Sequence, residues 1–399
     1  MGMRRLKLFM SLLLIVMVIT LPAAAFGQKT LNIGLYAALT GFAAPAEIHH
    51  RDGTLMAVEW INAKGGITVK GEKYLLKVIV EDNKTTAEGG KAAAEKLVYD
   101  HKVKFILGAT IPYMNIAAVE VTEPAKVLRL VNYCCETPPE LNANTPYTFI
   151  ANPASIDGIG PSMDYLIQKY PKLKTFATIT PADGAETYLL PLIDKEAKKK
   201  GLKQISSVTW PHDTADFYPI VTKLLSSRPE VVSLMNGYEQ ATGPIIKAAR
   251  EQGFKGPICM FNYDNPYDIV EIAGKGVVAP FWCHGWSKDL NDPQLTADMK
   301  DVIKTAIAKL GKFHQFNLWG RNEIMILAQA IEKAQSLDPT EVANTLRKME
   351  AVKTVFGPGK MGGLKTYGIN NKVCQPVAIT EVLPGGTVKH IKWISQYIP

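Results

Sequence analysis

The fold is indicated most clearly by the segment LNIGLYAALTGFAAPAEIHHRDGTLMAVEWINAKGGI (31–67), in which a pattern typical of a β-strand is followed by one typical of a helix. Residues 31–36 form a short apolar run that predicts a buried β-strand. Residues 53–66 predict a helix, because apolar side chains give it one broad face and Gly65-Gly66 end it. The apolar side chains of that face are Leu55, Met56, Val58, Trp60 and Ile61.

The same alternation continues downstream of this segment. Strands are predicted at 75–82, 103–107 and 127–131, and helices at 87–100 and 114–126. Strands that alternate with helices in this way build a parallel, doubly wound sheet with helices on both faces.

The pattern then restarts, which predicts a second lobe of the same kind. Predicted strands lie at 174–180, 204–210, 230–235 and 256–261, with helices near 186–200, 215–227 and 239–252 between them. The chain is helical again from about 292 and ends in glycine-rich turns and short strands after Phe356. We therefore expect an α/β protein with two Rossmann-like lobes. Open α/β sheets bind ligands at the carboxyl ends of their strands, so two facing sheets form a cleft.

The N-terminus predicts export from the cytoplasm. Arg4, Arg5 and Lys7 precede the apolar run 9–21, and small residues follow at Ala23 and Ala25. This arrangement is typical of a secretory signal peptide, residues 1–27, cleaved near 25–27. An uncleaved anchor is the alternative, but the apolar run is short of the roughly 20 residues that a span needs. The mature protein is expected in the periplasm.

Charge and cysteine content exclude several functions. Removal of the signal peptide lowers the net charge from +8 to +5, and the remaining charges are interspersed. The basic run 198–200 ends a predicted helix, where cations suit the helix dipole, so we expect no nucleic-acid partner. The five cysteines are Cys134, Cys135, Cys259, Cys283 and Cys374. Their number is odd and no CxxC occurs, so at least one thiol stays free.

No catalytic or metal motif is present. The chain lacks a G-x-S-x-G elbow, an HExxH helix and a P-loop. His49-His50 is the one histidine cluster, but adjacent helical residues point to different faces. Cys134 lacks an identifiable base, as a nucleophile would need. We expect neither an enzyme nor a metal or other cofactor.

In their order and spacing, several segments together resemble type I periplasmic solute-binding proteins of the branched-chain amino acid (Leu/Ile/Val) class. The resemblance begins with Gly41, Gly53, Met56–Glu59, Ile61-Asn62 and Gly65–Ile67 in the opening segment. It continues through VEDNKTTAEGGKAAAEKLV (80–98), with Asp82 at its usual place, and through 105–132, 216–258 and ILAQAIEKA (326–334). It covers essentially the whole mature chain.

The resemblance implies two lobes joined by three crossovers, the type I periplasmic binding protein fold. Such a protein closes on a small-molecule ligand and delivers it to an inner-membrane ABC permease; we expect a monomer. The crossovers are expected near 149–153, 281–285 and 356–360, with Gly-Pro-Gly at 357–359 as a hinge. Lobe 1 is then 28–150 plus 286–356, and lobe 2 is 151–285 plus 357–399. A ligand sensor for a membrane receptor is the alternative use of this fold.

The resemblance also implies which residues of this chain correspond to the ligand-binding positions of the family. The serine that holds the ligand carboxylate in the family corresponds to Pro112, which offers neither hydroxyl nor N–H, and Thr110 is the substitute donor. The family's Ala-Thr pair corresponds to Cys134-Cys135, and the tyrosine of its Asp-x-x-Tyr-Gly motif corresponds to Ala185. Asp264 is the nearest candidate for the family's ammonium-binding acid.

The predicted ligand-binding residues are Phe42, Thr110, Ile111, Tyr113, Tyr133, Cys134, Cys135, Asp183, Gly237, Tyr238, Tyr263 and Asp264. The residues that hold the ligand carboxylate in the family are replaced in this chain, and aromatic residues are plentiful near the expected cleft. We therefore expect a branched or aromatic carboxylate or amide ligand. Arg321 is either a further carboxylate partner or an exposed residue. Cys135→Thr is expected to change ligand preference more than stability.

Overall fold

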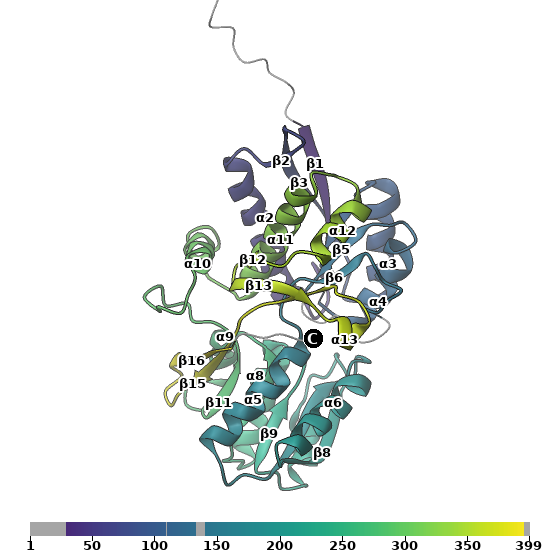
Figure 1. Ribbon diagram of the computed structural model, residues 1–399. Helices are drawn as coiled ribbons and strands as arrows, with labels where there is room; N and C mark the ends of the chain where they lie inside the picture. The colour runs from purple at the N-terminus through teal and green to yellow at the C-terminus, as the bar shows by residue number, and fades with distance from the viewer. Residues whose placement is uncertain (1–28, 109, 133–139, 395–399) are drawn as a thin grey trace, which may run out of the picture.

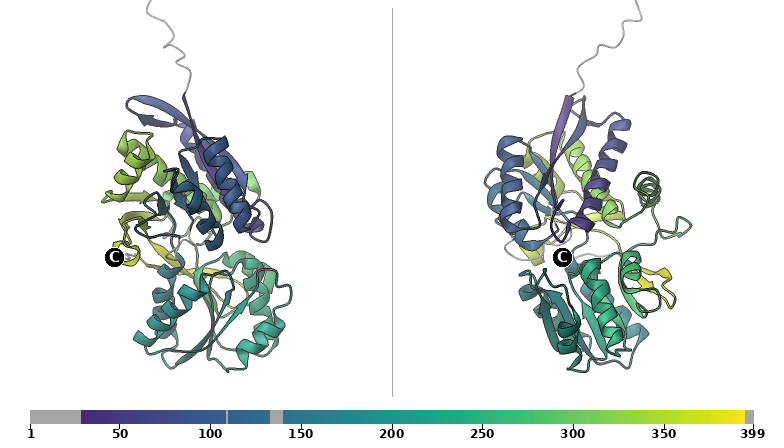
Figure 2. Two further views of the ribbon diagram at one scale, coloured as in Figure 1. Left: turned by 90° about the vertical axis from the view of Figure 1, so that its right-hand side faces the viewer. Right: turned by 180° about the vertical axis from the view of Figure 1, so that it is seen from behind.

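The fold comes from a computed structural model that describes residues 29–108, 110–132 and 140–394, with side chains up to 391. The chain forms two α/β lobes arranged end to end (Figure 1), and both further views separate the same two bodies (Figure 2). The predicted two-lobed α/β architecture is confirmed. The signal peptide, residues 1–27, and the candidates Tyr133, Cys134 and Cys135 lie outside the described residues.

Lobe 1 combines the N-terminal third of the chain with a later helical segment. Its elements are β1 (Lys29–Ala37), α2 (Ala44–Ala63), β2 (Ile67–Val69), β3 (Glu72–Asp82), α3 (Ala87–Glu95), a π-helical turn η1 (Lys96–Asp100), β4 (Phe105–Leu107), α4 (Pro112–Thr122), β5 (Leu128–Val131), β6 (Thr148–Ile150), α10 (Ala297–Leu310), α11 (Phe316–Ala334), α12 (Pro339–Arg347), β12 (Val352–Thr354), β13 (Gly357–Gly362), α13 (Leu364–Tyr367) and β14 (Lys372–Cys374). Its sheet has the order β12-β13-β14-β6-β5-β4-β1-β3-β2. Helix α2 begins nine residues before the predicted 53–66 helix.

Lobe 2 comprises the middle of the chain and its last two described strands. Its elements are α5 (Ser155–Lys169), β7 (Thr175–Pro181), α6 (Glu186–Lys199), β8 (Lys203–Trp210), α7 (Tyr218–Leu225), β9 (Val231–Leu234), α8 (Glu239–Glu251), β10 (Ile258–Tyr263), α9 (Pro266–Ala273), β11 (Phe281–His284), β15 (Val377–Val382) and β16 (Val388–Ile394). Its sheet has the order β16-β15-β11-β10-β9-β7-β8.

Strand β1 shows why these sheets are buried on both faces. Its residues Ile33 and Leu35 belong to the core beneath α2 and α11, whereas Tyr36 belongs to the core beneath α3 and α4. Successive strand residues point to opposite faces, so a strand between two helix layers is apolar throughout. The parallel pairing of β1 with β3 and β4 therefore matches its continuous apolar sequence.

The chain crosses between the lobes three times, after β6, after β11 and before β15. The first crossing follows Ile150 of β6 and the second follows His284 of β11. The third follows β14, because β13 pairs with β14, and β14 pairs with β6 of lobe 1. The expected boundary at 356/357 is therefore wrong: 357–374 belongs to lobe 1 and the crossing falls at Gln375-Pro376. Gly-Pro-Gly at 357–359 lies in strand β13, which pairs with β12.

Among the described residues, no helix has the length and apolar character needed to cross a membrane. Of the described cysteines, Cys259 and Cys283 are buried free thiols. Burial raises the pKa of both thiols, which keeps them protonated and unreactive.

The close approach of α2 and α11 gives a stability prediction. A Cβ on Gly320 would lie 2.4 Å from the His50 carbonyl oxygen and 2.5 Å from the Thr54 nitrogen, both backbone atoms. We expect Gly320→Ala to lower the free energy of unfolding by about 1–3 kcal/mol, because overpacking forces backbone shifts. Urea unfolding followed by circular dichroism measures this change.

Gly160→Ala is the matched control for this prediction. Gly160 also lies inside a helix, but its added Cβ would meet only the Glu196 carboxylate oxygen, at 3.6 Å. Alanine favours the helix by up to about 1 kcal/mol at both sites, so only the clash differs. Equal stability of the two variants would contradict the proposed contact.

Candidate functional site

The candidate site lies where loops at the carboxyl ends of both sheets face each other. Lobe 1 contributes Phe42 from the loop after β1 and Thr110 from the loop after β4. Lobe 2 contributes His212 from the loop after β8 and Tyr238 from the loop after β9. This is the edge at which open α/β sheets bind their ligands.

Direct side-chain contacts join the lobes across this cleft. The Phe42 and His212 rings are stacked, with centroids 4.0 Å apart and planes 15° apart. The Thr110 hydroxyl lies 3.0 Å from the Tyr238 hydroxyl, and the Tyr238 ring meets the edge of Phe42 at 6.0 Å. Side chains of opposite lobes touch in this way only when the lobes are closed on each other.

Glu47, in the first turn of α2, fixes the lobe 1 loops. Its buried carboxylate accepts hydrogen bonds from the Ala38 N–H (2.6 Å), from the Thr110 N–H (3.2 Å) and from the Thr110 hydroxyl. Burial raises the pKa of Glu47, although these N–H donors oppose that rise. A hydroxyl has one proton, so the Thr110 hydroxyl, which donates to Glu47, is left as an acceptor toward Tyr238.

Asp183 and His212 of lobe 2 are polar neighbours that are not hydrogen-bonded to each other. The Asp183 Oδ1 accepts from the Ala185 N–H at 3.0 Å, while Oδ2 lies 3.8 Å from His212 Nε2, too far for a hydrogen bond. Burial, together with the nearby acids Glu186 and Glu140, raises the pKa of Asp183 to about 7.

His212 is held by aromatic rings rather than by hydrogen bonds. Besides Phe42, its ring meets the edges of Trp210 at 5.4 Å and Tyr113 at 6.4 Å. Neither ring nitrogen of this histidine has a hydrogen-bond partner among the described residues. Burial lowers the pKa of His212 to about 4, so the ring is neutral at physiological pH.

Asp264 and Tyr263 lie in a second polar group, deeper in lobe 2. The buried Asp264 carboxyl accepts from the Thr242 hydroxyl (2.7 Å) and from the Asn265 N–H (2.9 Å). Burial and the neighbouring Glu239 raise the pKa of Asp264 well above its usual range. The Tyr263 ring is stacked on Trp286 at 5.2 Å. Asp264 is thus a carboxyl that accepts from protein donors and whose neutral form is favoured by burial.

Glu239 connects this deeper group to lobe 1. Its Oε1 lies 3.1 Å from His314 Nε2, and the His314 ring is stacked on His49 at 4.7 Å. The adjacent His50 instead contacts Glu323 at 3.0 Å, so the two neighbouring histidines have different partners. This divergence follows from their positions on different faces of α2.

The described candidate residues therefore fall into three places. Phe42, Thr110, Tyr113, Asp183 and Tyr238 gather where the lobes meet, and Tyr263 and Asp264 lie in the deeper group. Gly237 lies beside that group, because a Cβ there would come within 2.7 Å of the Thr242 hydroxyl. Ile111 is buried in the lobe 1 core.

Sequence reasoning missed His212 and Glu47. His212 follows the predicted strand 204–210 by two residues, so the rule that ligands meet the carboxyl ends of strands would have selected it. Glu47 carried no such signal, because its burial depends on α2 beginning at Ala44, before the predicted helix start.

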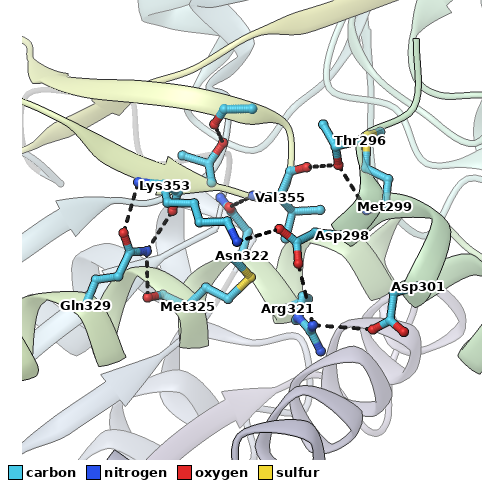
Figure 3. A network of polar contacts seen from close by, with 12 residues as sticks. Thr296, Asp298, Met299, Asp301, Arg321, Asn322, Met325, Gln329, Lys353 and Val355 are labelled. Atoms are coloured by element: carbon cyan, nitrogen blue, oxygen red, sulfur yellow. Dashed lines mark hydrogen bonds and ion pairs between the residues drawn. The ribbon is translucent and has the colours of Figure 1, made fainter. Parts of the chain in front are cut away.

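Of the two roles expected for Arg321, that of an exposed residue is wrong. It is only 3% exposed, and its guanidinium lies 3.8 Å from the Trp60 ring and 3.4 Å from Asp301. Figure 3 shows it between Asp298 and Asp301 on the α10 and α11 side of lobe 1. It lines a pocket of about 260 Å³ between α2, α10 and α11, separate from the cleft residues.

Comparison with known proteins extends this description. Residues 30–387 match the family model described as periplasmic binding protein. An "Amino acid binding protein" of Pseudomonas aeruginosa is 27% identical over 346 residues, covering 84% of this chain and 87% of the relative. A leucine-, isoleucine-, valine-, threonine- and alanine-binding protein of the same organism is 26% identical, covering 86% and 89%.

Solved structures share the fold at lower identity. The leucine-binding protein LivK of Thermotoga maritima superposes with a TM-score of 0.76 at 19% identity, covering 92% of this chain and 99% of that protein. A solute-binding protein of R. palustris in complex with 4-hydroxybenzoate superposes with a TM-score of 0.75 at 18% identity, covering 93% and 98%.

Proposed function

Since this chain belongs to the periplasmic binding protein family, we propose that it is the substrate-binding component of an ABC importer. In this role it closes on a small ligand in the periplasm and presents that ligand to an inner-membrane permease. Members of this family bind solutes rather than transform them. Relatives named for amino acid binding cover more than four-fifths of the chain, which supports this assignment.

The observation that carries the proposal is the pair of contacts across the cleft. Phe42 and Thr110 of lobe 1 meet His212 and Tyr238 of lobe 2 through side chains alone. His314–Glu239 and Lys372–Asp157 also join the lobes, and three chain crossings connect them, where backbone rotation separates or closes two rigid bodies. A ligand that contacts both lobes therefore stabilises the closed state by its differential affinity.

We propose a small amino-acid-like ligand, either a branched or aromatic carboxylate or the corresponding amide. The relatives' names include branched-chain amino acids, and one structural neighbour holds 4-hydroxybenzoate. The aromatic residues Phe42, Tyr113 and Tyr238 of the cleft suit an apolar portion of such a ligand.

Isothermal titration calorimetry of the chain from residue 28 onward tests this proposal. The panel comprises branched and aromatic amino acids, their amides, and aromatic acids. We expect at least one compound to bind with a stoichiometry near one, with a negative heat-capacity change from buried apolar surface. Absence of binding across the whole panel would contradict the proposed function.

A further inference from the structure

Asp183 is a buried charge site without a charge partner. Its side chain is 5% exposed, and its Oδ2 accepts no hydrogen bond from any described residue. A buried carboxylate that lacks a cation or sufficient donors is strongly disfavoured, so such groups occur where a ligand completes them.

The two charged groups with the largest effects on the Asp183 carboxyl are both acidic. Glu186, in the first turn of α6, and Glu140 both raise its pKa. Across the cleft, burial and, to a smaller extent, the charges of Asp183 and Glu47 raise the pKa of Tyr113, so these groups share one region.

Among the described residues, a buried lysine near the crossings does not compensate for this excess of negative charge. Lys372 is fully buried, but its ammonium is paired with Asp157 in the first turn of α5. His212 is neutral at physiological pH. None of these groups therefore supplies a positive charge that could pair with an ionised Asp183.

We propose that the ligand carries a protonated amine or amidine group that binds between Asp183 and His212. The two acceptors, Asp183 Oδ2 and His212 Nε2, are 3.8 Å apart, a separation that one ammonium can bridge by donating to both. The rings of Phe42, Tyr113 and Trp210 surround His212, and aromatic rings also attract cations. This inference rests on the proposed function, because it specifies the ligand of the same cleft.

The same geometry disfavours a ligand that is recognised by its carboxylate. The Thr110 hydroxyl donates to Glu47, Pro112 has no N–H, and the neighbouring described charges are negative. The ligand class is therefore an amine whose carboxylate is absent or converted to an amide.

Matched ligand sets test this inference by calorimetry. The branched set is isopentylamine, leucine and 4-methylpentanoate, and the aromatic set is phenethylamine, phenylalanine and 3-phenylpropanoate. We expect the amine of at least one set to bind at least tenfold more tightly than the acid of the same skeleton. Tighter binding of an acid than of the matching amine would overturn the inference but leave the proposed function intact. Absence of binding by all six compounds would count against both.

Variants of Asp183 make the test specific. We expect Asp183→Asn to weaken amine binding at least tenfold and Asp183→Glu, which keeps the charge, to retain the preference for amine over acid. Asp213→Asn is the control, because Asp213 is exposed and next to His212 in sequence; its amine affinity should stay within twofold of the parent. Thermal melting of each variant verifies folding, and unchanged amine affinity in folded Asp183→Asn would refute the role of Asp183.

The pH dependence provides an independent readout. With the lobes closed, burial raises the pKa of Asp183 to about 7, so the carboxyl must lose a proton before it pairs with a cation. Alkylamines stay protonated well above this pH. Amine affinity should therefore fall about tenfold per pH unit below 7 and level off above it. The same profile should be flat in Asp183→Asn; a slope that survives this substitution would exclude Asp183 as its origin.

Discussion

Replacement of Lys372 by methionine is expected to lower the free energy of unfolding by about 3–5 kcal/mol, because it leaves a buried carboxylate without its cation. Lys372 on β14 is fully buried, and the Asp157 side chain that it contacts is 4% exposed. Asp157 also accepts from the Ala154 N–H at 2.8 Å, which holds the first turn of α5. The pair joins strand β14 of lobe 1 to the first helix of lobe 2.

Lys198→Met is the matched control for this prediction. Lys198 forms an ion pair with Asp194 on the surface of α6, and its side chain is 72% exposed. Exposed pairs of this kind contribute about 0.3–0.5 kcal/mol. Chemical unfolding of both variants measures the difference. A loss below about 1 kcal/mol in Lys372→Met would mean that the buried pair contributes no more than a surface pair.

Phe42→Ala is expected to weaken ligand binding about tenfold to a hundredfold while leaving each lobe folded. The Phe42 ring contacts His212 and Tyr238 only when the lobes are closed. Each aromatic pair contributes about 0.5–1.5 kcal/mol beyond its buried area. Loss of two pairs therefore destabilises the closed state by about 1–3 kcal/mol, and 1.4 kcal/mol corresponds to tenfold in affinity.

Tyr99→Ala provides the control, because Tyr99 is 59% exposed on the η1 turn, outside the cleft residues. Calorimetry with whichever compound binds the parent protein measures both affinities. Equal affinities of Phe42→Ala and the parent would show that the stacked contact does not contribute to closure.

Much of the fold was predictable because local pattern and tertiary role agree in it. The apolar run of β1 is continuous since helices cover both faces of the sheet, and Gly65-Gly66 follow directly after α2. The third crossing was not predictable in the same way. Gly-Pro-Gly at 357–359 has the composition of a hinge, and only the pairing of β13 with β12 and β14 assigns it to lobe 1.

The candidate site was predictable in position more than in chemistry. The resemblance implied Thr110 as a ligand donor, Phe42 and Tyr238 were expected among the aromatic residues where the loops meet, and the structure brings the three together. Their roles depend on partners distant in sequence. Glu47, for example, accepts a hydrogen bond from the Thr110 hydroxyl, although the two residues are 63 positions apart. Likewise, the distance of Asp183 from the described cationic side chains depends on the fold. The amino-acid composition gives the number of charged residues but not which of them lie close together.

The central claim is that the two lobes close on a small ligand. Small-angle X-ray scattering tests it most directly, with the protein free and then saturated with the compound that calorimetry identifies. We predict a smaller radius of gyration on saturation, and a weaker change at the same ligand concentration in Phe42→Ala. An unchanged radius of gyration at full saturation of the parent protein would contradict the account.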